Sequence, residues 1–284
     1  MIKEGQIIKI IAGFYDVKSF DNQIFRLRAS GSLRDNNITP LVGDYVEFKD
    51  EQLLTKIKPR KNELIRPKVA NIDQAIIVTA LSEPSFSSLL LDKMLAIIES
   101  QSIPVVIIFT KSDLGNQQPY YDYQSQGYKC FMINNHDNSS NWNEIKNTLK
   151  NKLTVFTGQS GAGKTSLLNN LFNLSNETNE ISKALNRGKH TTRVVEIFEE
   201  ENMKIIDTPG FSSLVINLTK EELAKSYFDF KNWSKLCEFN SCLHYKEKNC
   251  EIKKQLEMKK LLNSRYENYI KMLLEILGAK KNYD

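Results

Sequence analysis

The stretch Gly158-Gln159-Ser160-Gly161-Ala162-Gly163-Lys164-Thr165 has the Gly-x-x-x-x-Gly-Lys-Thr spacing of a phosphate-binding loop. It follows the apolar run Leu153 to Thr157, which predicts a strand, and it opens a helical pattern that ends at Phe172. Between a strand and a helix, the glycines let backbone N–H groups and the helix start surround phosphate oxygens. Lys164 is expected to reach the β- and γ-phosphates, and Thr165 to offer its hydroxyl to Mg²⁺. The stretch therefore predicts an α/β domain that binds a nucleotide.

A second motif, Thr110-Lys111-Ser112-Asp113, comes earlier in the chain, at the end of the apolar run Val105 to Phe109. The Asp113 carboxylate can accept two hydrogen bonds at once, and guanine presents a matching pair of donors that adenine lacks. Lys111 is expected to pack its stem along the base. Alone, such a motif is most often a surface turn, but at the end of a buried strand it favours guanine recognition. Ordinary GTPases carry the two motifs in the opposite order, so the order here predicts a circular permutation.

A third motif, Asp207-Thr208-Pro209-Gly210, follows the predicted strand Met203 to Ile206. An Asp at a strand's carboxyl end can hold Mg²⁺ through water, and the Gly210 amide can donate to a γ-phosphate. Before this motif, the segment Gly188-Lys189-His190-Thr191-Thr192-Arg193 offers a Thr hydroxyl for the Mg²⁺ shell and suits a switch. The residue after Gly210 is Phe211, whose apolar side chain cannot orient the water that attacks the γ-phosphate. Another group must therefore orient this water.

The amino-terminal region consists of predicted short strands, at Gln6 to Tyr15, Gln23 to Ala29, Asp44 to Phe48 and Leu53 to Ile57. They predict a small antiparallel β-barrel, either of the OB type or SH3-like. The charged, Pro-containing stretch Lys58 to Lys68 is the predicted linker. Residues 1–69 hold 13 Lys and Arg against 9 Asp and Glu, which is a net +4 of the whole chain's +5. This balance permits nucleic-acid binding and equally fits an ordinary mixed surface.

From Ile72 onward, strands buried on both faces alternate with helical patterns, which predicts a doubly wound parallel sheet. Besides those named above, the predicted strands are Ala75 to Thr79 and Lys129 to Ile133, and the predicted helices are Leu89 to Glu99 and Trp142 to Lys150. Near the carboxyl end, Glu251 to Leu277 has helical spacing, and its leucines are expected to pack in a core or against another domain rather than to face a membrane.

The composition of 284 residues, with 40% hydrophobic and 26% charged residues, permits two or three domains. No apolar run approaches the roughly 20 residues of a membrane span, and the first residues lack a signal-peptide pattern, so a cytoplasmic protein is expected. Cys237, Cys242 and Cys250 crowd around His244, which in a cytosolic chain favours a metal over disulfides. Three thiolates and one imidazole fill a tetrahedral shell, which predicts one structural Zn²⁺ ion. The remaining Cys130 is expected to be a small buried residue.

Taken together, these blocks resemble the RsgA (YjeQ) family, circularly permuted GTPases that help the small ribosomal subunit mature. The resemblance covers nearly the whole chain, including Gly31-Ser32-Leu33-Arg34, Val42-Gly43-Asp44, Arg66-Pro67, Ala70-Asn71-Ile72-Asp73 and Arg265-Tyr266-Glu267-Asn268-Tyr269. It implies a multidomain protein: an OB-type RNA-binding barrel at 1–69, a circularly permuted α/β P-loop GTPase domain at 70–215 and an α-helical zinc-binding domain at 216–284. It also implies a monomer that binds no membrane, GTP hydrolysis stimulated by the 30S subunit, contact with 16S rRNA, and His190 as the catalytic residue that orients water.

The predicted GTP-binding residues are Thr110, Lys111, Ser112, Asp113, Gly158, Gln159, Ser160, Gly161, Ala162, Gly163, Lys164, Thr165, Ser166, Thr191, Thr192, Asp207 and Gly210, with Mg²⁺ held at Thr165 and Asp207. Thr110 replaces the usual Asn of the base-reading motif, whose amide would tie strand ends together and contact the base, so weaker nucleotide affinity is expected. The segment Ile133-Asn134-Asn135-His136 gives no recognisable final base-contacting loop. Two other functions stay open at this point: an ATP-dependent P-loop enzyme, and a non-catalytic RNA-binding scaffold that uses nucleotide only for folding.

Overall fold

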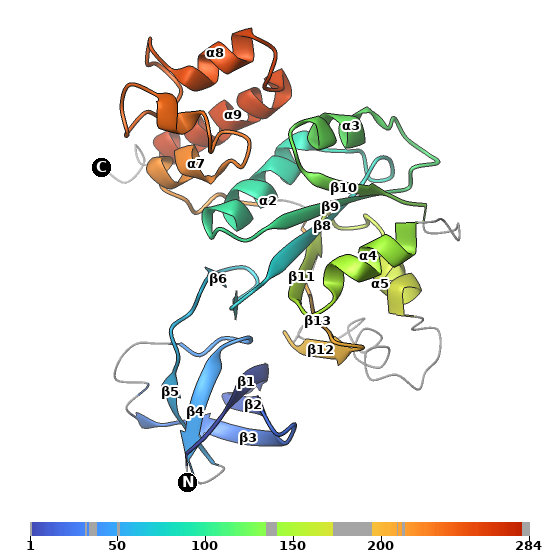
Figure 1. The fold of residues 1–284 in the computed structure, drawn as a ribbon, viewed down its shortest axis with the longest axis vertical. Coiled ribbons are helices and arrows are strands. Elements are labelled where there is room, and N and C mark those ends of the chain that lie inside the picture. The colour runs from blue at the N-terminus through green and yellow to red at the C-terminus, as the bar shows by residue number, and fades with distance from the viewer. Residues whose placement is uncertain are drawn as a thin grey trace. The chain divides into compact units, whose positions relative to one another are not determined.

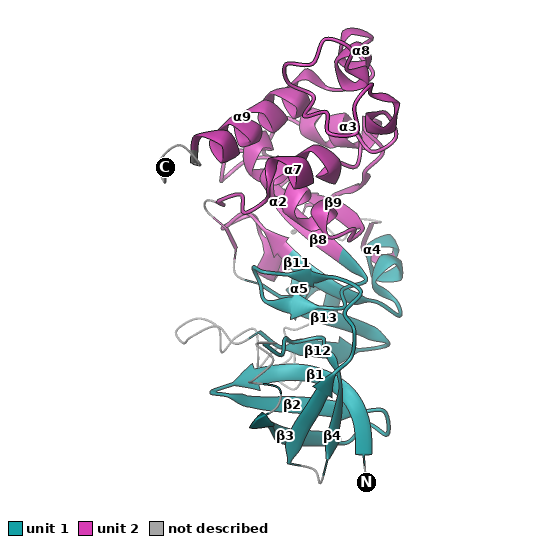
Figure 2. Ribbon diagram, turned by 90° about the vertical axis from the view of Figure 1, so that its left-hand side faces the viewer, with its two compact units in different colours: residues 1–74, 144–156, 168–209 teal, residues 75–143, 157–167, 210–284 magenta. Residues whose placement is uncertain are grey.

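The computed structural model describes residues 2–31, 33, 39–49, 52–134, 141–172, 195–208, 210–211 and 214–279. The chain divides into two compact units (Figure 2). Unit 1 comprises residues 1–74, 144–156 and 168–209, and unit 2 comprises residues 75–143, 157–167 and 210–284. Each unit therefore gathers segments that are far apart in the sequence.

Unit 1 contains a closed five-stranded barrel with the strand order β1-β2-β3-β5-β4. Its strands are β1 (Ile2–Ile11), β2 (Phe14–Ser19), β3 (Ile24–Ala29), β4 (Tyr45–Lys49) and β5 (Leu53–Ile57). Strand β5 lies between β3 and β4 and runs parallel to β3, which makes the barrel a Greek key of the OB type rather than an SH3-like one. Ile7, Val17, Leu27 and Phe48 are fully buried inside it.

One predicted strand of the barrel was wrong. The stretch Gln6 to Tyr15 is not one strand but the end of β1, a turn and the start of β2. The turn lies at Ala12 and Gly13, whose φ angles are 48° and 80°. Only Gly adopts such angles at no steric cost, and an isolated Gly in an apolar run was too weak a signal to end the predicted strand.

The remaining long strands have the order β10-β9-β8-β11-β13-β12. They are β8 (Gln74–Ala80), β9 (Val105–Thr110), β10 (Lys129–Met132), β11 (Leu153–Gly158), β12 (Ile197–Glu200) and β13 (Met203–Asp207) (Figure 1). The pairs β8–β9, β9–β10 and β11–β13 are parallel, as predicted, whereas β12 pairs antiparallel with β13. Every residue of β8 and of β11 is buried, as expected of parallel strands covered on both faces.

The helices near these strands are α2 (Ser88–Ser100), α3 (Gln118–Ser125), α4 (Asn141–Leu149) and α5 (Lys164–Phe172). All but α3 were predicted to within a residue or two. Helix α3 carries almost no apolar periodicity, because it is a polar, Tyr-rich helix in which only Tyr123 is buried. The predicted linker contains β6 (Glu63–Leu64), which pairs antiparallel with β7 (Val69–Ala70) just beyond its end.

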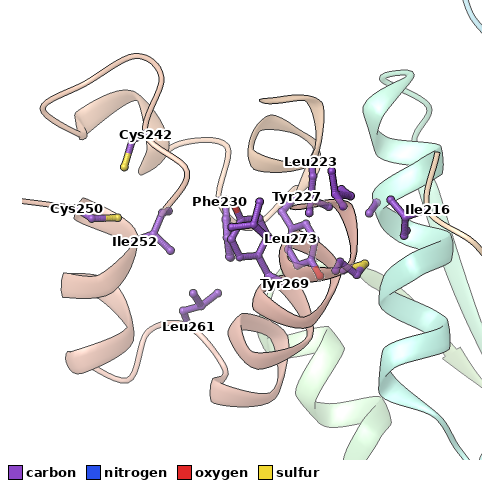
Figure 3. Close-up of a cluster of buried hydrophobic side chains, with 13 residues drawn as sticks. Ile216, Leu223, Tyr227, Phe230, Cys242, Cys250, Ile252, Leu261, Tyr269 and Leu273 are labelled. Carbon is purple, nitrogen blue, oxygen red and sulfur yellow. The ribbon is translucent and has the colours of Figure 1, made fainter. Parts of the chain in front are cut away.

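The carboxyl-terminal part of unit 2 is helical, with α7 (Lys220–Ser226), η1 (Ser234–Leu236), α8 (Glu251–Glu257) and α9 (Asn263–Ala279). The helical pattern predicted over 251–277 is thus two helices, separated where Lys259 adopts a φ of 58°. Tyr227, Phe230, Tyr269 and Leu273 form the centre of a buried cluster (Figure 3). The expectation that all the leucines pack inward was wrong for Leu274, which is 46% exposed.

Among the described residues, none of the helices combines the length and the apolar composition that crossing a lipid bilayer requires.

Candidate active site

The P-loop connects the end of β11 to the first residue of α5. At Gly158 no side chain is possible, because a Cβ would lie 2.0 Å from the Val78 carbonyl oxygen of β8. The loop then turns through Gly161 and Gly163, which have φ angles of 78° and 82°. Helix α5 has no acidic residue in its first turn, which suits an anion at its positive N-terminal end. The predicted strand-to-helix turn with its glycines is therefore present, and phosphate binding by it stays a prediction.

The base-reading motif begins at the last residue of β9, Thr110, which is fully buried. Its hydroxyl lies 2.6 Å from the Ala162 carbonyl oxygen of the P-loop and 3.3 Å from that of Thr79. The Thr110 hydroxyl therefore supplies part of the tie that an Asn amide would make, and the expected loss of nucleotide affinity stays a prediction. Asp113 is exposed, which agrees with the prediction that its carboxylate contacts a base.

The third motif is split between the units, with Asp207 and Thr208 in unit 1 and Gly210 in unit 2. Asp207 is the last residue of β13, opposite Phe156 of β11. In unit 2, Gly210 lies so close to the P-loop that a Cβ would meet the Ser160 Cα at 2.8 Å. Pro209 is outside the described residues.

Phe211 is bound to the P-loop through its backbone. Its N–H donates to the Gly158 carbonyl at 2.8 Å, and its carbonyl accepts from the Ser160 N–H at 2.9 Å. The residue that follows the Asp-x-x-Gly motif is thus fixed by the P-loop itself. Its apolar side chain agrees with the interpretation that the attacking water is oriented from elsewhere.

Unit 2 therefore brings together three predicted groups of site residues: Thr110 to Asp113, Gly158 to Ser166, and Gly210. The predicted residues His190, Thr191 and Thr192 lie outside the described residues, as do Asn135 and His136 of the final base-contacting segment. The other two residues of that segment are described, and Ile133 is a buried residue whose N–H donates to the Phe109 carbonyl at 2.8 Å.

The four predicted zinc ligands come together in the carboxyl-terminal helical region. The ligand atoms of Cys237, Cys242, His244 and Cys250 all lie within 4.8 Å of one another. The His244 Nδ1 is 3.6 Å from the Cys237 Sγ and 3.4 Å from the Cys250 Sγ. Metal–ligand bonds of about 2.0–2.3 Å place the ligands of a tetrahedral zinc ion at similar separations, so the residues fit such an ion.

The surroundings of this cluster favour a neutral imidazole and hold its backbone in place. Burial lowers the pKa of His244 and raises the pKa of Cys242 to about 12, so the thiol needs a cation to become thiolate. The Glu247 carboxylate accepts hydrogen bonds from the backbone N–H groups of Leu243 and Tyr245, which flank the histidine, with N–O distances of 2.8 and 2.9 Å. Cys130 is separate from the cluster and buried, as expected, and burial raises its pKa to about 12.

Sequence reasoning missed a buried polar network around Arg265. This guanidinium is 1% exposed and contacts Asp92 of α2, Asp229 and the Tyr128 hydroxyl. Burial alone would lower the pKa of Arg265, but Asp229 and Asp92 outweigh burial and raise it. Its neighbour Asn268 donates to Asp92 at 2.7 Å. Arg265 and Asn268 belong to a block that carries the family resemblance, but a charged residue among the apolar positions of a predicted helix ordinarily marks an exposed face, so its burial was not predicted.

Comparison with known proteins agrees with this geometry. The family model described as RsgA GTPase matches residues 57–217, and the RsgA N-terminal domain matches residues 4–54. The chain belongs to the RsgA GTPase family. It is therefore a GTP hydrolase, in which an OB-type barrel precedes a circularly permuted GTPase domain and a helical region with a Cys3His cluster follows.

RsgA relatives match over their full length. The small ribosomal subunit biogenesis GTPase RsgA of Mesomycoplasma hyopneumoniae (strain 7448) is 48% identical, with 99% of this chain and 100% of the relative covered. The protein of the same name from Bacillus subtilis (strain 168) is 41% identical, with 99% of both covered. Among solved structures, the circularly permuted GTPase YloQ matches with a TM-score of 0.78 and 36% identity, covering 98% of this chain and 96% of YloQ. YjeQ from Thermotoga maritima matches with a TM-score of 0.79 and 28% identity, covering 98% of this chain and 99% of YjeQ.

Proposed function

We propose that this protein binds the small ribosomal subunit and assists its late maturation, hydrolysing GTP with stimulation by the 30S particle. The observation that carries the proposal is that unit 2 contains the base-reading motif Thr110 to Asp113, the P-loop and Gly210. Full-length similarity to proteins named for small-subunit biogenesis supports the choice of partner. We place the protein in the cytoplasm, as a monomer, where 16S rRNA is its contact.

The proposed division of labour follows the sequence motifs. Residues 1–69 contact RNA, residues 70–215 hydrolyse GTP, and residues 216–284 hold one structural zinc ion. In the GTPase domain, Asp113 reads guanine and Lys164 neutralises the phosphates, while Thr165 and Asp207 would hold the Mg²⁺ ion that adds positive charge beside them. Thr191 and Thr192 belong to the same proposed nucleotide-binding set. At the Cys3His cluster, three thiolates and one imidazole would fill the four positions of a Zn²⁺ ion, which leaves none open for chemistry.

Guanine recognition is tested by exchanging Asp113 for Asn. Guanine has an amino donor at C2, whereas xanthine has a carbonyl acceptor there, so a carboxamide at position 113 matches xanthine and a carboxylate matches guanine. Asp113→Asn should weaken GTP binding roughly 100-fold and improve binding of the xanthosine nucleotide. Equal affinity of the wild-type protein for GTP and ATP would contradict the assignment and favour a general P-loop ATPase.

Partner binding is tested by co-sedimentation with 30S and 50S particles in GTP, GDP and a non-hydrolysable GTP analogue. The proposal is supported if the protein sediments with 30S but not with 50S particles, and if the bound fraction differs between GTP and GDP. Binding to both particles in every nucleotide state would overturn it. Multiple-turnover phosphate release with and without 30S particles then separates an enzyme from a scaffold.

The proposed role of His190 is to orient the attacking water, since Phe211 lacks a polar group. His190→Ala should retain GTP binding and lose the turnover that 30S particles stimulate. Unchanged stimulated turnover would remove His190 from the mechanism. Lys189→Ala, next to it in the chain, is the matched control for nonspecific effects on the segment.

A further inference from the structure

One segment of unit 2 touches both nucleotide motifs. Residues Leu81 to Ser87, which follow β8 and end at the cap of α2, are here named the strap. We propose that the strap fixes the spacing between the base reader and the P-loop, and that Gln159 is the positioning residue that fastens it. The proposal rests on the nucleotide site proposed above and adds a residue that acts through its side chain on the strap rather than on the nucleotide.

The strap meets the base-reading segment at three points. The Leu81 N–H donates to the Thr110 carbonyl at 3.1 Å. The Lys111 ammonium donates to the carbonyl of Glu83. Two residues past Asp113, Gly115 lies so close to the strap that a Cβ would be 2.7 Å from the Leu81 carbonyl oxygen. The base-reading segment is therefore held along the strap from Thr110 to Gly115.

The strap meets the P-loop through one side-chain hydrogen bond. The Gln159 side-chain amide donates through Nε2 to the Ser85 carbonyl at 3.2 Å. Pro84 lies near the P-loop as well, because a Cβ added to Gly161 would be 3.5 Å from the Pro84 Cδ. A nucleotide that contacts both motifs binds most tightly when the motifs already have the correct spacing. Binding then does not have to fix flexible parts of the protein, which would cost free energy.

Gln159 is a poor choice for stability alone. Its Nε2 hydrogen bond lies at the surface, and its buried Oε1 accepts no hydrogen bond from the described residues. A buried acceptor without a donor destabilises the folded state, and an exposed hydrogen bond does little to offset it. If the Oε1 and Nε2 atoms of Gln159 were exchanged, the buried amide nitrogen would lack an acceptor and the amide oxygen would face the Ser85 carbonyl oxygen. The orientation in the structure avoids both unfavourable arrangements. The glutamine is therefore explained by its tie to the strap.

The test replaces Gln159 with Met, which has a similar length and no polar side-chain donor. Gln124→Met is the matched control, because Gln124 also donates through Nε2 at 3.2 Å, to Tyr120, on the exposed side of α3. Gln159→Met should raise the Kd for GDP and for GTP by roughly 3–10-fold. The KM for GTP should rise by the same factor with kcat unchanged, since the lost interaction affects ground state and transition state alike. Gln124→Met should leave all of these within about twofold.

A purely structural glutamine gives a different result. Removing the unsatisfied Oε1 should leave the melting temperature of nucleotide-free Gln159→Met unchanged or higher, while affinity falls. Affinity within twofold of wild type would overturn the strap proposal, and so would a lower melting temperature that accompanies the affinity loss. If the wild-type protein itself binds neither GDP nor GTP, the proposed nucleotide site is wrong and the strap proposal is overturned with it.

Discussion

At the scale of the residue, Thr110 joins the two nucleotide motifs through one buried hydroxyl. Thr110→Val keeps the shape of the side chain but leaves the Ala162 carbonyl without its 2.6 Å donor. The affinity for GDP and GTP should fall by about 3–10-fold, because one hydrogen bond contributes about 0.5–1.5 kcal/mol. Equilibrium titration with fluorescent nucleotide measures the change. Thr148→Val is the control, since it also removes a buried hydroxyl donor, 2.7 Å from the Ile145 carbonyl, in a helix of unit 1. Equal losses in the two variants would contradict a specific role.

Glu99, near the end of α2, should make the free energy of unfolding depend on pH. Burial raises its pKa from 4.5 to about 8, although Arg265 opposes the rise. In the unfolded chain the carboxyl loses its proton near pH 4.5, whereas in the folded protein it keeps the proton to about pH 8. Between these values the folded state binds the extra proton, so the free energy of unfolding should decrease as pH rises. Glu99→Gln should flatten that dependence in urea titrations between pH 5 and 8, and an unchanged slope would contradict the assignment.

At the scale of the element, two ion pairs join α9 to α2 and differ in burial. Arg265 and Asp92 are buried, whereas Glu275 of the pair with Lys93 is 42% exposed. Arg265→Met should destabilise the protein by about 3–5 kcal/mol, because it leaves buried carboxylates without their partner. Glu275→Gln should cost less than about 1 kcal/mol, because water and salt screen an exposed pair. Denaturant unfolding compares the two, and equal effects would contradict the importance of burial here.

The sequence predicted the elements whose signal is local and missed those that depend on distant partners. Strands β8 and β11 were predictable because continuous β-branched runs suit a position buried on both faces. Helix α3 was missed because its one buried side chain, Tyr123, is held by packing and by its bond to Asp92 rather than by periodicity. The break between α8 and α9 was missed because Lys259 gives no sign of a positive φ in the sequence.

The sequence was most informative about the candidate site, since phosphate and metal chemistry demand particular residues at particular spacings. What the motifs did not reveal were the contacts that support them, such as Thr110 with Ala162 and Gln159 with Ser85. These use backbone carbonyls as acceptors, and every residue type has one. Sequence patterns therefore indicate the residues expected to touch a ligand, but they do not indicate the residues that position them.

At the scale of the whole molecule, the permuted order brings the end of the GTPase motifs close in sequence to the Cys3His cluster. Cys242 and Cys250 are part of the same buried cluster as Tyr227 and Tyr269, so the Cys3His cluster and the helical core form one structure (Figure 3). The hydroxyls of Tyr266 and Tyr269 donate to the carbonyls of His244 and Leu243 at 2.8 and 2.6 Å, which attaches α9 to the ligand loop. Loss of the metal should therefore loosen α9 as well as the loop.

Metal removal tests this connection. The purified protein should contain about one equivalent of zinc, and a chelator should lower its melting temperature by roughly 10 °C or more, because binding energy at a structural site is folding energy. Protons compete with the metal for thiols whose pKa is raised by burial, so the chelator should act more completely at pH 6 than at pH 8. Cys237→Ser should lose the zinc and melt like the chelated protein, whereas Cys130→Ser, which alters a buried thiol outside the cluster, should keep it. A zinc-free protein whose melting temperature is insensitive to chelator would show that the four residues hold no structural metal.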